Sequence, residues 1–176
     1  MAMDGPFSEE LGANLLKKDG YKDNVVLCLN YDGKFGLNNM NNYFQCANHE
    51  GEAVVWGEWI YKKGDPILFN DSKRFPVLYN NLKGWIVEIE RNKTDIRFTI
   101  DIDMKLTEKE CKENEIEFVK DTGKYTRICL QIFKYNYNVP ENEIDEMRMK
   151  AVVPFQLAYA VSIHKAQGLE YDSVKI

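Results

Sequence analysis

The sequence predicts an α/β protein whose α/β lobe is interrupted by an antiparallel β insertion. At residues 25–29 the run VVLCL is apolar throughout, as in a strand buried on both faces of a parallel sheet. From about residue 64 apolar residues follow a period of two, and a helical period returns at Pro154. We therefore expect a helix and the first part of the lobe in residues 1–63, a small β-barrel in 64–149, and the rest of the lobe in 150–176.

The first part of the lobe is expected to hold two helices and a strand. Ser8 can cap a helix over residues 8–18, and Gly20 follows its end. The strand at 25–29 and a loop at 30–34 come next. Helical spacing then runs to about Cys46, through Leu37, Met40, Asn41 and Phe44.

The insertion reads as short antiparallel strands. Residues 85–89 and 96–102 alternate apolar and polar side chains on either side of a turn at Asn92 and Lys93, which predicts a half-buried hairpin. Thr107 and Glu110 have the spacing of a capping box at the start of a short helix. Further strands are expected at residues 67–69, 116–119 and 125–137, with a turn at 121–123. Several short strands with little helix indicate a small barrel.

Much of the site-like chemistry lies between residues 158 and 170. Pro154 before and Gly168 after predict a helix over residues 154–167. On such a helix Ala158, Ser162 and Lys165 fall on one narrow seam, which could offer a hydroxyl and an ammonium to the phosphates of an extended nucleic acid. Glu170 leads into a strand over residues 171–176, which is expected to share a sheet with residues 25–29, and could accept a hydrogen bond from a ribose hydroxyl. The alternative is packing: His164 lies in the core, the Lys165 stem covers apolar surface, and Gly168 only ends a helix.

Composition narrows the class of protein. The 176 residues carry 23 Lys and Arg against 28 Asp and Glu, a net charge of −5, which argues against independent, non-specific nucleic-acid binding. The acidic run at 101–121 is interpreted as a solvated face. Four widely spaced cysteines and two histidines give little support to a metal- or nucleophile-dependent hydrolase. No apolar run reaches about 18 residues. We expect a cytoplasmic monomer with no membrane contact.

Three stretches resemble one known family. The segment LAYAVSIHKAQGLEYDSVKI resembles motif V of superfamily 1 helicases, in the form found in the RecD-like and UvrD-like C-terminal domain family. Upstream, NVVLCLNYDGKFGLNNMNNYFQ is similar to the motif IV region, with matching positions at Gly36, Met40, Asn41 and Gln45. The segment from Gly64 to residue 89 is similar to an inserted SH3-like β-barrel. Asn81 stands where that barrel usually has glycine, and asparagine tolerates the same left-handed turn.

The resemblance implies an incomplete RecA-like α/β lobe with an inserted antiparallel SH3-like β-barrel. It also implies that Ser162, His164 and Lys165 face nucleic-acid phosphates, that Gly168 and Glu170 face ATP between two RecA-like domains, and that Gln167, on the ATP side, couples the two. The sequence has no G-x-x-x-x-G-K-[ST] phosphate loop.

We therefore expect a fragment of an ATP-dependent DNA or RNA helicase that is not catalytic alone. The parent would need ATP and Mg²⁺, whereas this chain holds no cofactor. Single-stranded DNA or RNA would bind weakly without the remaining helicase domains. The alternative is a stand-alone protein-interaction β-barrel module with a relic helicase motif.

Overall fold

The structure is a computed structural model that describes residues 24–167 and 173–175. It divides into two compact units. Unit 1 holds the described parts of Met1–Glu52 and Leu157–Ile176 together with Gly64–Pro66, and unit 2 holds Ala53–Lys63 and Ile67–Gln156. The helix predicted at residues 8–18 lies outside the described residues.

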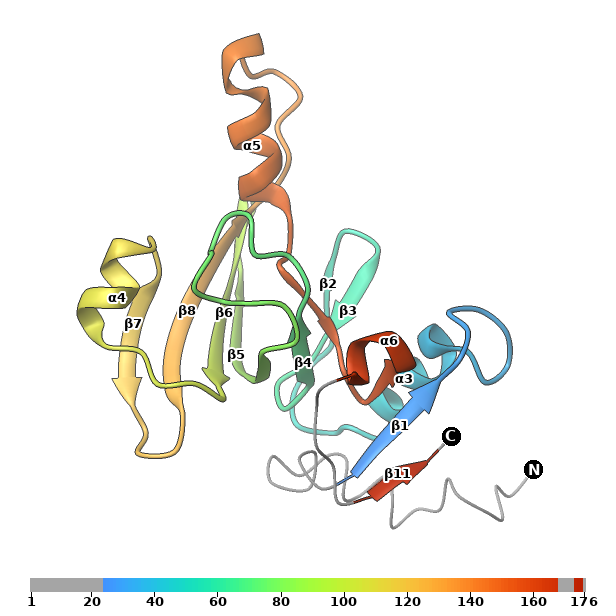
Figure 1. The fold of residues 1–176 in the computed structure, drawn as a ribbon. Coiled ribbons are helices and arrows are strands. Elements are labelled where there is room, and N and C mark those ends of the chain that lie inside the picture. Colours follow the sequence, from blue (N-terminus) through green and yellow to red (C-terminus); the bar gives the residue numbers. More distant parts are fainter. Residues whose placement is uncertain (1–23, 168–172, 176) are drawn as a thin grey trace. The chain divides into compact units, whose positions relative to one another are not determined.

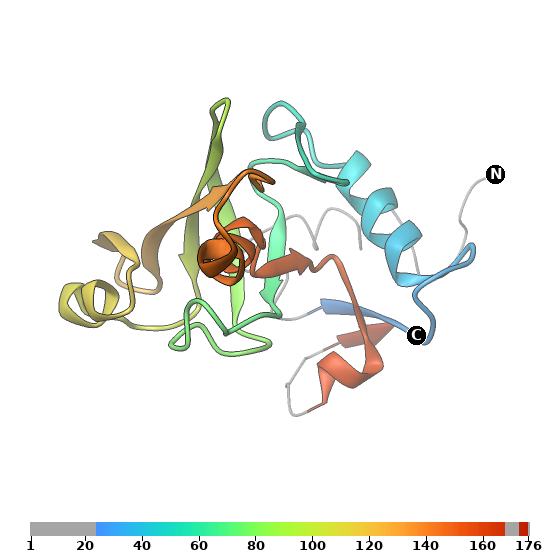
Figure 2. The same ribbon diagram turned by 90° about the horizontal axis from the view of Figure 1, so that it is seen from above.

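Unit 1 contains a parallel three-stranded sheet with the order β10-β1-β11. Strand β1 (Asn24–Cys28) pairs with β10 (Ala160–Ser162) on one side and β11 (Ser173–Lys175) on the other. The two views of Figures 1 and 2 show β1 and β11 side by side. The prediction that residues 25–29 and 171–176 share a sheet is thereby confirmed for the paired residues.

The helix predicted after the first strand is confirmed. Helix α3 spans Leu37–Cys46, and its apolar face is buried. The core of unit 1 combines this face with the sheet and consists of Val26, Cys28, Leu37, Met40, Phe44, Tyr159 and Ala160.

The helix predicted over residues 154–167 is wrong. The segment forms strand β9 (Phe155–Leu157), strand β10 and only one helical turn, α6 (Ile163–Ala166). Residues 158–162 are all buried, so an apolar run there suits a strand packed on every side as well as a buried helix. Backbone partners decide the outcome: β10 pairs with β1, and the Ala158 amide donates to the Pro66 carbonyl (2.9 Å).

Unit 2 is built on a six-stranded sheet with the order β7-β8-β6-β5-β4-β9. Its strands include β4 (Pro66–Phe69), β5 (Lys83–Arg91), β6 (Asp95–Ile102), β7 (Glu117–Asp121) and β8 (Thr126–Phe133). The predicted hairpin is confirmed as β5 and β6, with a register shift between Ile86 and Glu88. Within the described residues β7 and β9 are the two edges and no closed barrel forms, so the SH3-like barrel stays a prediction.

Four elements of unit 2 were not predicted. Strands β2 (Val54–Trp56) and β3 (Trp59–Tyr61) form a separate antiparallel hairpin. A single 3-10 turn, η1 (Glu141–Glu143), leads into helix α5 (Ile144–Ala151), which projects from the sheet in Figure 1. No residue of α5 is buried.

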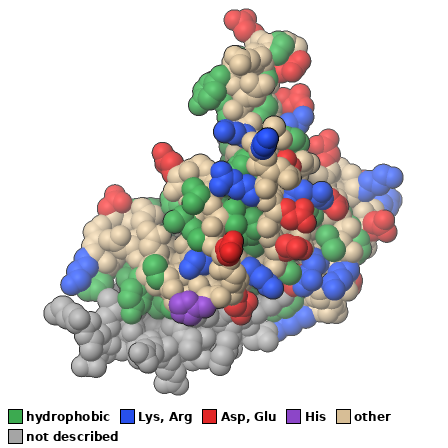
Figure 3. Space-filling view, turned by 180° about the vertical axis from the view of Figure 1, so that it is seen from behind, with side chains coloured by type: hydrophobic (Ala, Val, Ile, Leu, Met, Phe, Trp, Pro, Cys, Tyr) green, Lys and Arg blue, Asp and Glu red, His purple; other side chains and the backbone are tan. Residues whose placement is uncertain are grey.

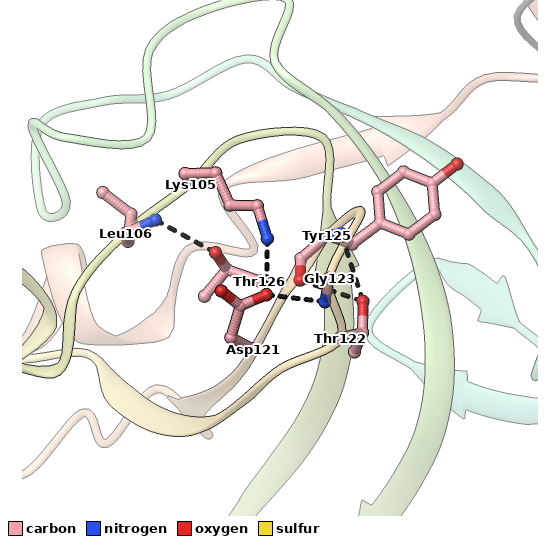
Figure 4. Close-up of polar contacts among 7 residues, drawn as sticks. All are labelled: Lys105, Leu106, Asp121, Thr122, Gly123, Tyr125 and Thr126. Carbon is pink, nitrogen blue, oxygen red and sulfur yellow. Dashed lines mark hydrogen bonds and ion pairs between the residues drawn. The ribbon is translucent and has the colours of Figure 1, made fainter.

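Local chemistry fixes several turns of unit 2. Thr107 and Glu110 form the predicted capping box of helix α4 (Glu108–Glu113). At the turn between β7 and β8, Asp121 pairs with Lys105 and accepts a hydrogen bond from the Gly123 amide (2.7 Å), as Figure 4 shows. Each of these contacts stabilises the backbone at a point where the chain enters or leaves a helix or strand.

The left-handed turn predicted at Asn81 is also confirmed. Its φ is +70°, and its amide donates to the Phe69 carbonyl (2.8 Å). A residue tolerant of positive φ is therefore required at this position.

The solvated face expected for the acidic run is wrong at one position. Asp101 is only 1% exposed, and its carboxylate accepts two hydrogen bonds from Arg127, from Nε (2.7 Å) and Nη2 (2.9 Å). These bonds raise the pKa of Arg127. A paired, two-point contact explains how this carboxylate is buried in an apolar sheet.

Candidate functional site

Strand β10 and the turn that follows it carry the described part of the predicted site. Ser162 is the last residue of β10, His164 and Lys165 lie in α6, and Gln167 follows. Gly168 and Glu170 lie outside the described residues. The predicted helical seam is not formed, because Ala158 and Ser162 precede the helix.

The exposure of these residues bears on the packing alternative. His164 is exposed, so it is not a core histidine. Lys165 is half-buried, and this burial lowers the pKa of its ammonium group. Ser162 is 4% exposed, and its Oγ has no hydrogen-bond partner among the described residues. Buried hydroxyls are normally paired, so this oxygen is free to bond a group outside the described chain.

Strand register sets where this turn lies. Cys28 of β1 is aligned with Ser162 of β10, and the two strands are parallel. Residues 29–35 and helix α6 therefore leave the sheet at the same edge, the carboxyl end of its strands. In open α/β sheets ligands bind at this edge.

The loop at this edge of β1 presents aromatic rings and a cation. Tyr31 is 53% exposed and Phe35 is 58% exposed. The Lys34 ammonium lies 5.5 Å from the centre of the Phe35 ring. Exposed rings beside a cation are the groups that stack on bases and pair with phosphates in single-strand binding sites.

Gly36 lets this loop close onto α3. Its amide donates to the Gly33 carbonyl (3.0 Å), and the Leu37 amide donates to that of Asn30 (2.9 Å). A Cβ at Gly36 would lie 2.5 Å from the backbone of Asp32. Only glycine fits here without moving the loop.

Asn41 of α3 holds β10 in place. Its Nδ2 donates to the Ala160 carbonyl (3.1 Å), and its Oδ1 accepts from the Ala160 amide (3.0 Å). The side chain is 7% exposed. One amide group thus satisfies both backbone groups of a residue two positions before Ser162.

A buried carboxylate lies behind this arrangement. Asp65 is fully buried and accepts hydrogen bonds from Gln45 Nε2 (2.6 Å), Asn48 Nδ2 (2.8 Å) and the Tyr159 hydroxyl (2.7 Å). Burial, followed by the charge of Asp65 and its hydrogen bond, raises the pKa of Tyr159 far above its ordinary value. The phenol therefore stays protonated and acts as a donor.

Asn48, Asp65 and Tyr159 were not predicted as parts of this arrangement. Asp65 lies in the segment that is similar to the SH3-like insertion, and Tyr159 lies in the range predicted as a helix. The one signal in the sequence was the position of Asp65, a charged residue, beside the strand predicted at residues 67–69. The donors of Asp65 could not be paired in advance, since they are separated from it by as many as 94 residues.

Two general features limit the chemistry. Within residues 24–167 and 173–175, no three His, Cys, Asp or Glu side chains are grouped so as to hold a metal ion. Nor does that part of the chain contain a helix that is long and apolar enough to span a membrane.

Comparison with known proteins gives remote structural neighbours. No protein-family model matches the chain, and no curated protein matches it. Solved structures that match include a Pif1 helicase from Bacteroides in complex with ADP-AlF3 and ssDNA, at 16% identity and a TM-score of 0.44, covering 94% of this chain and 37% of that one. Bacteroides Pif1 bound to ssDNA matches at 15% identity and a TM-score of 0.42, covering 95% of this chain and 42% of that one.

The chain thus spans about two fifths of these neighbours. TM-scores below about 0.5 do not establish a shared fold.

Proposed function

We propose that this chain is part of the second RecA-like domain of an ATP-dependent DNA or RNA helicase, and that its motif V lies in residues 157–176. Unit 1 would be the incomplete RecA-like lobe. The six-stranded sheet of unit 2 would belong to an inserted SH3-like barrel. ATP and Mg²⁺ would bind in the longer parent protein.

One observation carries the proposal. The three segments that resemble the helicase family are far apart in sequence but share one buried hydrogen-bond network. Gln45 comes from the motif IV stretch, Asp65 from the barrel signature, and Tyr159 from the motif V stretch. Asn41 adds a second link, to Ala160 across 119 residues. Convergence of this kind is expected if the three stretches serve one site, and packing alone does not require it.

The network gives each candidate residue a role. By fixing β10, it fixes Ser162 at the carboxyl edge of the sheet, where the free Oγ would bond a phosphate of a single strand. Lys165 would add a charge-assisted contact, and a phosphate would offset the cost of its partial burial. His164 is exposed for a third contact. Gln167 would link this strand contact to ATP, which Gly168 and Glu170 would face.

The first test uses the chain as it is. Fluorescence anisotropy of a labelled dT20 oligonucleotide should show weak binding, above about 1 µM in Kd, at 150 mM salt, because few phosphates are contacted. At 20 mM salt binding should tighten, and Lys165→Ala should then weaken it and lower the salt slope by about one. Lys112→Ala removes an exposed lysine of α4 and is the matched control. An equal effect of both substitutions would refute the role of Lys165.

The second test uses the longer protein encoded by the flanking sequence. Lys165→Ala should lower single-strand affinity and the stimulation of ATPase by nucleic acid, while basal ATPase persists. Glu170→Ala should leave strand affinity nearly intact and weaken nucleotide binding by roughly 1–3 kcal/mol, the value of a buried polar contact. If both variants lose the same property, or neither loses any, the motif V assignment is wrong.

A further inference from the structure

Unit 2 contains a cavity of about 130 Å³ at the base of helix α5. Its lining brings together the stretch after β4 and the end of α5, and consists of Asp71, Lys73, Arg74, Arg148, Met149, Val152 and Pro154. Three cationic side chains stand against one carboxylate. Figure 3 shows lysine and arginine side chains gathered at the base of the projecting helix. Within a chain of net charge −5, this is a locally basic site.

Arg74 is held in position by the protein. Its Nη1 donates to the carbonyls of Gln131 (2.9 Å) and Lys150 (3.3 Å), and its guanidinium lies 4.6 Å from the centre of the Phe75 ring. Burial lowers its pKa, attraction to Glu115 opposes this, and arginine remains charged. A guanidinium has five N–H donors, and within the described residues Arg74 donates through Nη1, so the donors on Nε and Nη2 remain for an anion.

Arg148 and Lys73 contribute two further positive charges to the cavity, on side chains that the protein does not hold in one position. Arg148 contacts Asp145 at 3.5 Å, but these side chains are 66% and 93% exposed, and such a pair holds weakly. Lys73 is exposed at the other side of the lining. The one carboxylate of the lining, Asp71, already accepts a hydrogen bond from the Lys73 amide (2.8 Å).

Apolar groups lie beside these cations. Met149 is 43% exposed and Val152 is 44% exposed, although both line the cavity. Methionine adapts its shape to apolar partners of different kinds. The site therefore offers apolar surface and positive charge within a few residues of each other.

We infer that this cavity binds a short acidic peptide segment of a partner protein, in which carboxylates alternate with leucine-like side chains. Carboxylates match the fixed guanidinium of Arg74 and the mobile one of Arg148, and an apolar side chain matches Met149 and Val152. A nucleic-acid strand fits less well, because no aromatic ring lines the cavity and a strand needs a row of stacking and phosphate contacts. This inference is independent of the proposed helicase function.

The test uses the whole chain and a fluorescein-labelled probe peptide, Asp-Leu-Asp-Glu-Leu-Asp. Polarisation should show saturable binding with a Kd on the order of 100 µM at 50 mM salt. The neutral peptide Asn-Leu-Asn-Gln-Leu-Asn should bind at least about tenfold more weakly, and Arg148→Glu should weaken the acidic probe by a similar factor. Arg91→Glu, at an exposed arginine of β5, is the matched control and should have less than a twofold effect.

A second readout locates the probe without disturbing the fold. In ¹H–¹⁵N NMR spectra the amides of residues 71–74 and 148–152 should shift on titration, and Met149→Ser should reduce affinity while leaving the free spectrum elsewhere unchanged. The inference is overturned if no saturable binding occurs up to 1 mM peptide, or if Arg91→Glu and Arg148→Glu act equally. It is also overturned if a dT12 oligonucleotide binds tighter than the peptide with the same loss in Arg148→Glu.

Discussion

Replacing Tyr159 by phenylalanine should loosen unit 1 by a measurable amount. The substitution removes only the hydroxyl that donates to Asp65 at 2.7 Å, and both residues are fully buried. A hydrogen bond to a charged acceptor contributes about 1.5–3 kcal/mol. We expect local opening of unit 1 to become easier by about 2 kcal/mol, which corresponds to roughly 30-fold faster exchange of its amides.

Hydrogen exchange with mass spectrometry measures this directly. Peptides covering residues 37–48 and 157–163 should take up deuterium faster in Tyr159→Phe, whereas peptides from β5, β6 and β8 should not change. Tyr43→Phe is the control, because it makes the same chemical change on α3 at a side chain that is 48% exposed. Asp65→Asn should cost more than Tyr159→Phe, since it replaces one acceptor oxygen by an NH2 group that faces Gln45 on one side of the carboxylate or Asn48 and Tyr159 on the other, and it removes the charge that strengthens the remaining bonds.

Equal exchange of Tyr159→Phe and Tyr43→Phe in these peptides would show that the hydrogen bond to Asp65 does not stabilise unit 1. An acceleration spread equally over both units would show the same, since the hydroxyl donates to Asp65 of unit 1.

Two further predictions concern turns. Gly36→Ala should destabilise the chain by several kcal/mol, because its Cβ would lie 2.5 Å from the Asp32 backbone. Gly123→Ala, with open space around its Cβ and a φ of +85°, should cost only about 1–2 kcal/mol of backbone strain. Urea unfolding followed by circular dichroism compares the two variants, and equal unfolding midpoints would contradict the steric clash at Gly36. Hydrogen bonds from the Thr107 amide and hydroxyl lower the pKa of Glu110. This contact therefore stabilises the fold above the ordinary pKa of glutamate, and the stabilisation is lost as the pH falls through the lowered pKa. Thr107→Ala should move the pKa of Glu110 toward its usual range in an NMR titration, and an unchanged pKa would contradict the capping assignment.

Local signals in the sequence predicted much of the fold. The helical spacing of Leu37, Met40 and Phe44 predicted α3, and the alternation of apolar and polar residues predicted β5 and β6. In each case one face of the element is buried and the other faces solvent. The Thr107–Glu110 spacing gave the cap of α4 for a similar reason, since a capping box is satisfied within four residues. Elements whose stabilising contacts lie within a few residues of one another can therefore be predicted from the sequence.

The conformation of the stretch from Phe155 to Ser162 was predicted wrongly, because the contacts that decide it are distant in sequence. Its Ala, Tyr and Val residues are buried, so the apolar run that was interpreted as a helical period fits a buried strand as well. The backbone partners that decide its form are distant, such as Asn41 for Ala160. Helix α5 was missed because none of its residues is buried, which leaves no apolar stripe.

The candidate site shows the same division. Ser162, His164 and Lys165 were selected from a motif, and the structure brings them to one turn at the sheet edge, although not as the predicted seam. The network around Asp65 could not be predicted, because Gln45, Asn48 and Tyr159 become its partners only after the chain has folded.

The parallel pairing of β1 has a consequence for the order in which the chain folds. Both neighbours of β1 come from the segment after Phe155, whereas β5 pairs with β6, and β7 pairs with β8, through short loops. Loop closure makes such distant pairing slow, and short hairpins form fast. During synthesis β1 would therefore wait with open edges until β10 and β11 are made, while the β5–β6 and β7–β8 hairpins of unit 2 could already be formed. A ribosome stalled between Arg127 and Ala158 should expose β1 to proteases and chaperones, and release of the remaining residues should end that exposure.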